Sequence, residues 1–274
     1  MKTIVTHFAP DLDGITAIWL LKTFLPEWKE AAIAFVPAGK TLHDAPADRD
    51  PEVLHVDTGF GKFDHHQTSD DTCAALKVYA SLGKHDEALE RLLHVVNDTD
   101  HFREVFFPSP MSDFWDLSLG SIIDGMQMTM VNNPLGMIDG IMDCLDASYK
   151  MFQNKVWAEK EIKEKAIIFE TKFGKSFGIE SVNRETVHFG QKMGYVIVVR
   201  KDPKVGSVQI KSIPKDDIDL TTLYEEVKIK DPAATWFLHA GKHMLLNGSA
   251  KNPDMKPTKL TLNQVIETVK KIYG

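Results

Sequence analysis

The chain has 274 residues, of which 43% are hydrophobic and 26% charged, a balance typical of a folded protein with one large domain or two ordinary ones. No apolar run approaches the roughly 20 residues of a membrane span, and the N-terminus lacks a secretory signal pattern, so we expect a soluble, cytoplasmic protein without a membrane partner. The net charge of −7 argues against broad binding to long duplex nucleic acid, which needs dense Lys and Arg contacts to phosphate.

The charge is divided unevenly along the chain. Residues 1–149 contain 10 Lys and Arg against 24 Asp and Glu, a balance of −14, whereas residues 150–274 contain 22 against 15, a balance of +7. An acidic half concentrates cations and a basic half attracts anions, as a metal-dependent enzyme for a phosphorylated substrate requires. A drift of surface charge without any function explains the same counts equally well.

The first half alternates between strand and helix patterns. Residue patterns predict strands at 3–8, 31–36 and 53–57, and helices at 14–24, 71–82, 86–96 and 117–130. This alternation predicts an α/β fold with a parallel sheet flanked by helices. Ligands bind at the carboxyl ends of the strands in such sheets.

The second half has a different pattern. A long helical run covers residues 139–173, and strands at 186–189, 195–200, 207–213 and 234–238 follow, with helices at 220–227 and 262–272. We therefore predict a catalytic domain at 1–135, a helical connection at 136–175 and a smaller α+β substrate-binding domain at 176–274. The active site is expected in the cleft between the two domains.

Acids and imidazoles gather where the predicted strands and helices of the first half end. Each residue alone is better explained as a helix cap, a turn or a core histidine. Together they would leave unpaired negative charge unless a cation were bound, and Asp57 could bridge two cations in a hydrolytic centre that activates water against a phosphoryl group. The candidate metal ligands are His7, Asp11, Asp13, Asp57, His65 and Asp98.

These motifs, in this order, resemble the four motifs of the DHH phosphoesterase superfamily, and residues 63–67 are similar to its Myg-type exonuclease branch. They are His7-x-x-x-Asp11-x-Asp13-Gly14, Asp57, Asp64-His65-His66 and Asp98-Thr99. The superfamily also contains oligoribonucleases, cyclic-dinucleotide phosphodiesterases and family II inorganic pyrophosphatases. The resemblance covers roughly the first 100 residues and implies a DHH-type catalytic domain.

The resemblance also implies a role for each residue. One manganese ion would be held by His7, Asp11 and Asp57, and a second by Asp13, Asp57, His65 and Asp98, with Mg²⁺ or Co²⁺ as substitutes. The catalytic set would be Asp57, His66, which contacts the substrate phosphate, and Asp64, which orients an imidazole without binding metal. Asp100 competes with Asp98, but the Asp98-Thr99 pair matches the family pattern better.

The C-terminal part departs from the family pattern. Members with a substrate domain usually end in a Gly-Gly-Gly-His type motif, whereas this chain has His239-Ala240-Gly241-Lys242-His243 and Asn247-Gly248-Ser249. These segments could cradle a phosphate or a base, although an ordinary hairpin with an Asn-Gly turn explains them as well. The predicted substrate-binding residues are His66, Arg200, His239, Lys242, Asn247, Gly248 and Ser249.

The sequence therefore predicts a manganese-dependent phosphohydrolase, which cleaves phosphoester bonds of short oligonucleotides or nucleotides with water activated by two metal ions. An inorganic pyrophosphatase and a metal-dependent nucleotide sensor without turnover are the alternatives. A structural protein with a vestigial site, using the Met-rich segment 126–137 as its interface, is a third. A homodimer is left open.

Overall fold

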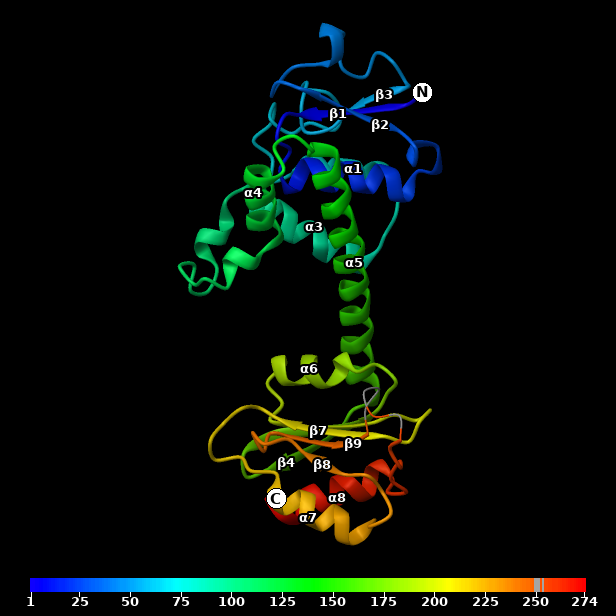
Figure 1. Ribbon diagram of the computed structural model, residues 1–274, viewed down its shortest axis with the longest axis vertical. Coiled ribbons are helices and arrows are strands. Elements are labelled where there is room, and N and C mark those ends of the chain that lie inside the picture. The colour runs from blue at the N-terminus through cyan, green and yellow to red at the C-terminus, as the bar shows by residue number, and fades with distance from the viewer. Residues whose placement is uncertain (249–251, 253) are drawn as a thin grey trace. The chain divides into compact units, whose positions relative to one another are not determined.

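The computed structural model describes residues 1–248, 252 and 254–274, so the predicted contact Ser249 lies outside the described residues (Figure 1). The chain divides into two compact units, Met1–Gln153 and Asn154–Gly274. Helix α5 (Pro134–Lys165) contains the boundary between them. Among the described helices, none combines the length and the apolar character that crossing a membrane requires.

The first unit contains a three-stranded parallel sheet with the strand order β2-β1-β3. Its strands are β1 (Thr3–His7), β2 (Ala32–Val36) and β3 (Val53–His55). The helices are α1 (Leu12–Phe24), α2 (Ala74–Ser81), α3 (Glu87–Asp100) and α4 (Leu119–Thr129), with short 3₁₀ turns at Pro26–Trp28, Leu42–Asp44, Arg103–Phe106 and Trp115–Leu117. The fold is α/β, as the sequence predicts.

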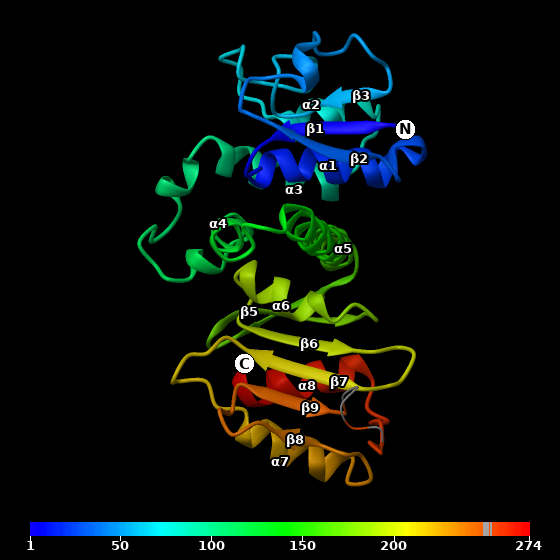
Figure 2. The same ribbon diagram turned by 45° about the horizontal axis from the view of Figure 1, so that its top comes forward.

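Helix α1 lies at the centre of this unit. It lies against one face of the sheet (Figures 1 and 2) and packs against α2 and α3. All its residues from Leu12 to Leu21 are buried, because sheet and helices enclose it on all sides. The helix begins at the cap Asp11 and ends before Pro26, which cannot continue it. The start of α1 is thereby fixed at the carboxyl end of β1.

The second unit is built on a six-stranded mixed sheet with the order β4-β5-β6-β7-β9-β8. Only β5 and β6 pair in parallel; the other neighbours are antiparallel. The strands are β4 (Ile167–Thr171), β5 (Gly174–Glu180), β6 (Ile197–Lys201), β7 (Val208–Ser212), β8 (Phe237–Leu238) and β9 (Met244–Asn247).

Helices cover both faces of this sheet. Helix α6 (Glu185–Lys192) lies on one face, and α7 (Thr221–Lys230) and α8 (Leu262–Tyr273) lie on the other (Figure 1). Successive residues of β6 therefore enter different cores: Ile197 and Val199 pack with α7 and α8, and Val198 packs with α6. This alternation follows from the two-residue period of a strand.

Three sequence-based expectations are wrong. The helix predicted to reach residue 173 ends at Lys165, and β4 follows. Residues 186–189, predicted as a strand, lie in α6, because four residues are too few to separate the two periodicities. Residues 97–100, beyond the end of the helix predicted at 86–96, form the last turn of α3.

Candidate metal centre

The carboxyl ends of β1 and β3 bring the first two candidate ligands together. His7 is the last residue of β1, and Asp57 follows β3 by two residues. Parallel neighbours end at the same edge of the sheet, so the two side chains meet there, with His7 Nε2 3.1 Å from Asp57 Oδ2.

Helix N-termini hold the next two acids. Asp11 caps α1, and its Oδ1 accepts the backbone N–H groups of Asp13 and Gly14 at 3.0 and 3.1 Å. The buried Asp13 carboxylate accepts the N–H groups of Ala74 and Ala75 at 2.7 and 2.8 Å, where α2 begins. These donors and the positive ends of both helices stabilise the two carboxylates.

Asp57 occupies a special backbone position. Its φ is 55°, in the left-handed region that Asp and Asn tolerate better than most residues. The side chain is only 2% exposed. Gly14 makes room for it, because a Cβ there would lie 3.2 Å from Asp57 Oδ2 and from Thr6 Oγ1.

His65 faces three carboxylates. Its Nε2 lies 3.4 Å from Asp57 Oδ1, 3.6 Å from Asp100 Oδ2 and 3.8 Å from Asp13 Oδ2. These residues come from α1, the β3 loop and the end of α3. His65 therefore stands at the middle of the acidic cluster.

Asp64 organises the loop that carries both histidines. Its Oδ2 accepts the Phe60 N–H at 2.6 Å, and its Oδ1 accepts the N–H of His66 at 3.0 Å. The His66 Nδ1 lies 2.8 Å from the same Oδ1, while 55% of the His66 side chain is exposed. Asp64 thus orients an imidazole that reaches solvent beside the cluster.

Three groups of side chains place their ligand atoms within 4.8 Å of one another. Asp57 belongs to two of the groups and His65 to two, and one group contains both residues, so the three form one continuous centre. The groups are His7, Asp11 and Asp57; Asp57, His65 and His66; and Asp13, His65 and Asp100.

The electrostatics of the centre reflect crowded negative charge. Burial and the nearby Asp57 raise the pKa of Asp11, and raise the pKa of Asp13 to about 8. The Asp57 carboxylate, which lies close to the Nε2 atoms of both rings, raises the pKa of both His7 and His65 to about 9. Burial would raise the pKa of Asp57 as well, but the nearby imidazole of His65 and the hydrogen bond with His7 outweigh it and hold that pKa below its ordinary value.

Polar atoms without partners converge in the same place. Asp57 Oδ1, His65 Nε2 and Asp100 Oδ2 are buried, and within the described part of the chain none has a hydrogen-bond partner. Such atoms are costly to bury unless something else binds them. A divalent cation fits, because carboxylate oxygen and imidazole nitrogen together are the donor set of Mn²⁺, Fe²⁺ and Zn²⁺ sites.

Asp100 joins this centre, whereas Asp98 does not occur in any of the three groups. Asp98 Oδ1 instead accepts from Arg103 Nη1 at 3.1 Å, and Arg103 also binds Asp71 at 2.7 Å. Side chains two positions apart on a helix point in directions about 200° apart, so only one of Asp98 and Asp100 faces the centre. The geometry thus favours Asp100 over the residue that the family pattern preferred.

Two predicted substrate contacts in the second unit are engaged in internal structure. Arg200 is buried, and its guanidinium binds Asp202 Oδ2 at 2.8 Å and the Val182 carbonyl at 3.2 Å. The buried Asn247 side chain donates to the Thr235 carbonyl at 2.8 Å and accepts the Thr258 N–H at 2.7 Å. The structure gives both residues a structural role.

The other predicted contacts lie around the β8–β9 turn. Lys242 has a φ of 59° and binds Asp219 Oδ2 at 2.6 Å, and His239 Nδ1 accepts the Gly241 N–H at 3.1 Å. Gly248 follows β9 with a φ of 81°. Their substrate roles stay predictions.

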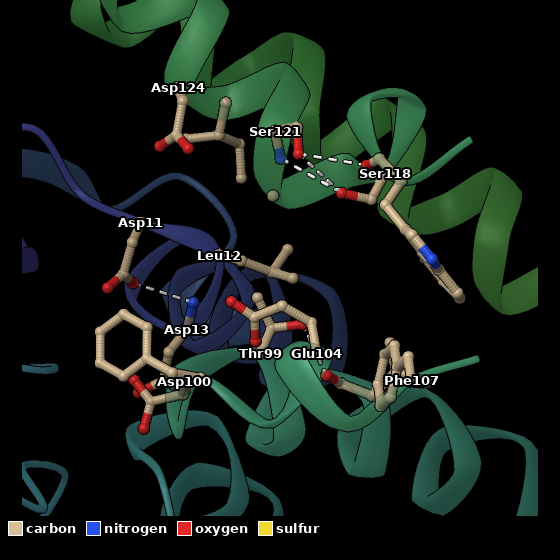
Figure 3. Close-up of a pocket in the computed structure, with 15 residues that line it drawn as sticks. Asp11, Leu12, Asp13, Thr99, Asp100, Glu104, Phe107, Ser118, Ser121 and Asp124 are labelled. Carbon is tan, nitrogen blue, oxygen red and sulfur yellow. Dashed lines mark hydrogen bonds between the residues drawn. The ribbon is translucent and has the colours of Figure 1, made fainter. Parts of the chain in front are cut away.

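A cavity of about 300 Å³ adjoins the centre, and no sequence pattern predicts it. It lies between the start of α1, the end of α3 and the start of α4 (Figure 3). Asp11, Asp13 and Asp100 line one side, and aromatic residues from the segment after α3 line another. No periodic pattern marks that segment, so only the folded chain brings it to the metal ligands.

No family model matches the chain, and no curated protein matches it significantly. Among solved structures, the chain is similar to the pGpG-specific phosphodiesterase PggH from Vibrio cholerae. The sequence identity is 14% and the TM-score 0.31, and the match covers 100% of this chain and 99% of that one.

Proposed function

We propose that this chain is a DHH-type phosphohydrolase that cleaves phosphoester bonds of short oligonucleotides or nucleotides with the help of two divalent cations. The observation that carries the proposal is that Asp57 and His65 link three ligand groups into one cluster that contains buried atoms without hydrogen-bond partners. A structural protein has no need to bury such a cluster.

We propose two ion positions. One ion would be held by His7, Asp11 and Asp57, and the other by Asp13, His65 and Asp100, two of the groups described above; Asp57 would also contribute to the second. We propose manganese, with Mg²⁺ or Co²⁺ as substitutes. When bound, such an ion pair lowers the pKa of a water and neutralises charge on phosphoryl oxygens.

The remaining chemistry belongs to His66 and Asp64. The Asp64 carboxylate accepts a hydrogen bond from His66 Nδ1, so Nε2 is free to meet a ligand. His66 would meet a phosphate oxygen of the substrate through Nε2. Because the ring is half-exposed beside the cluster, it reaches a substrate without leaving its hydrogen bond.

The test is Mn²⁺-dependent hydrolysis of a substrate panel by the purified protein. The panel contains pyrophosphate, mononucleotides, cyclic dinucleotides, pGpG and short RNA and DNA oligomers. We expect turnover of short nucleotide phosphoesters, abolished by chelation and lowered at least about a hundredfold by Asp57→Asn. Asparagine tolerates the left-handed backbone of this position, so the variant keeps its fold.

Asp113→Asn, at an exposed position that belongs neither to the three ligand groups nor to the lining of the adjoining cavity, is the matched control and should keep full activity. Turnover of pyrophosphate alone would identify a pyrophosphatase instead. Tight Mn²⁺ binding without turnover of any substrate would contradict the proposal and indicate a sensor.

A further inference from the structure

The cavity beside the metal centre has an aromatic wall whose rings are held in place. Phe107 and Trp115 pack with ring centroids 5.2 Å apart. The Trp115 indole donates to the carbonyls of Pro108 and Ser109 at 3.3 and 3.1 Å, which fixes its orientation. Rigid aromatic faces of this kind are stacking surfaces for nucleobases.

Phe102 adds a third ring at the same cavity. It follows the last turn of α3 with a φ of 55°, a conformation that is costly for a bulky side chain. Its side chain is 74% exposed, so burial does not compensate for this cost. Strain of this kind clusters at ligand sites, where it positions a side chain for binding.

Glu104 supplies a polar group to the same wall. Its Oε2 is buried and, within the residues that the structure describes, has no hydrogen-bond partner. Glu104 is also absent from the three ligand groups around Asp57 and His65. The carboxylate is therefore left to accept hydrogen bonds from a ligand.

The charge of the cavity excludes a phosphate as that ligand. Its described lining includes the acids Asp11, Asp13, Asp100, Glu104 and Asp124, and contains no Lys, Arg or His. Without bound metal this lining repels anions. Beyond the metal ligands, it suits a flat, uncharged group that donates hydrogen bonds.

We propose that this cavity is a nucleobase subsite that selects guanine, which deepens the proposed function and rests on it. Guanine presents two adjacent donors, N1–H and the 2-amino group, which one carboxylate accepts together. Adenine presents an acceptor at N1, and hypoxanthine lacks the 2-amino group. A volume of about 300 Å³ is at the small end for ligand sites and matches one base next to a phosphate at the centre.

The experiment compares guanine, hypoxanthine and adenine in matched ligands. Binding of GMP, IMP and AMP to the Mn²⁺-loaded protein is measured by calorimetry, and kcat/KM is measured for pGpG, pIpI and pApA. We expect the affinity for GMP to exceed that for IMP, and kcat/KM for pGpG to exceed that for pIpI, by about tenfold or more. Glu104→Gln should bring that ratio close to one, because the amide NH₂ introduced at position 104 is a donor and cannot accept from the 2-amino group of guanine. Glu30→Gln, at an exposed position away from the cavity, should leave it unchanged.

The ratio of guanine to hypoxanthine separates base recognition from a folding defect, since a purely structural defect lowers the affinity and kcat/KM for all three bases alike. Equal binding of the three bases by the wild type, or an unchanged ratio in Glu104→Gln, would overturn the subsite even if hydrolysis is intact. Glu104-dependent preference for GMP without hydrolysis of any dinucleotide would support the subsite and contradict the proposed catalysis.

Discussion

At the scale of single residues, the centre depends on one close approach between a glycine and an acid. Gly14 lies in the first turns of α1 directly against Asp57, and the space left by its missing side chain is filled by the Asp57 carboxylate. Glycine costs helix stability relative to alanine, by about 1 kcal/mol. The position thus favours the geometry of the centre over the stability of the helix.

Gly14→Ala should weaken Mn²⁺ binding by about tenfold while the protein stays folded. The added Cβ lies 3.2 Å from Asp57 Oδ2, so the carboxylate must shift by a few tenths of an ångström, and metal sites tolerate such shifts poorly. Calorimetric titration with Mn²⁺ measures the change. Gly125→Ala in α4, where a Cβ meets no atom within 4 Å among the described residues, is the matched control. Equal affinity in the two variants would contradict the argument.

At the scale of elements, the end of α3 decides which acid serves the centre. Asp100 should be required for metal binding and Asp98 should not. We expect Asp100→Asn to weaken Mn²⁺ binding by about 10- to 100-fold, because it removes a charged group beside His65 and Asp13. Asp98→Asn removes only a partly exposed ion pair with Arg103, which is worth about 0–1 kcal/mol.

Thermal unfolding with and without Mn²⁺ tests this pair independently of activity, because a bound ion raises the melting temperature according to its affinity. Asp98→Asn should keep the Mn²⁺-induced increase and Asp100→Asn should lose most of it. The reverse result would restore the assignment based on the family pattern.

A tyrosine at the end of α8 makes the stability of the second unit fall at alkaline pH. The buried Tyr273 hydroxyl donates to the Asp219 carbonyl at 2.7 Å, and burial raises the pKa of Tyr273 to about 12. The unfolded chain releases this proton near pH 10 and the folded chain holds it to about pH 12. The stability that it contributes is therefore complete below pH 10 and is lost between about pH 10 and 12.

Urea unfolding across pH 9 to 12 measures this loss. Tyr273→Phe should be less stable at pH 9, by about 1 kcal/mol for the missing hydrogen bond, and its stability should fall less steeply above pH 10. Parallel curves for the wild type and the variant would contradict the assigned role.

At the scale of the whole molecule, the charge asymmetry predicts a salt effect on substrate capture. Residues 150–274 carry a balance of +7, which attracts an anionic oligonucleotide over long range. We expect KM for a 5′-phosphorylated dinucleotide to rise several-fold between about 0.05 and 0.5 M salt, with kcat little changed, because added ions screen distant charges. Bis(p-nitrophenyl) phosphate, with one negative charge, should respond less. Identical salt responses of both substrates would contradict this prediction.

The sequence alone determined the α/β class and most of the candidate centre. Strand periodicity, the cap Asp11 and the stop Pro26 are local signals, and parallel strands necessarily end at one edge of a sheet. His7, Asp11, Asp13, Asp57 and His65 therefore came together as expected. Local signals failed where they were short or ambiguous, as in α6 and after Lys165.

Only the tertiary structure decided between Asp98 and Asp100, because the choice depends on where α3 ends and which side of its last turn faces His65. Arg200 and Asn247 looked available for substrate in the sequence, but Arg200 binds the Val182 carbonyl and Asn247 binds Thr235 and Thr258, which lie on other segments of the chain. The cavity around Glu104 likewise joins segments that share no periodic pattern. Such features depend on non-local packing, which a linear pattern of residues does not record.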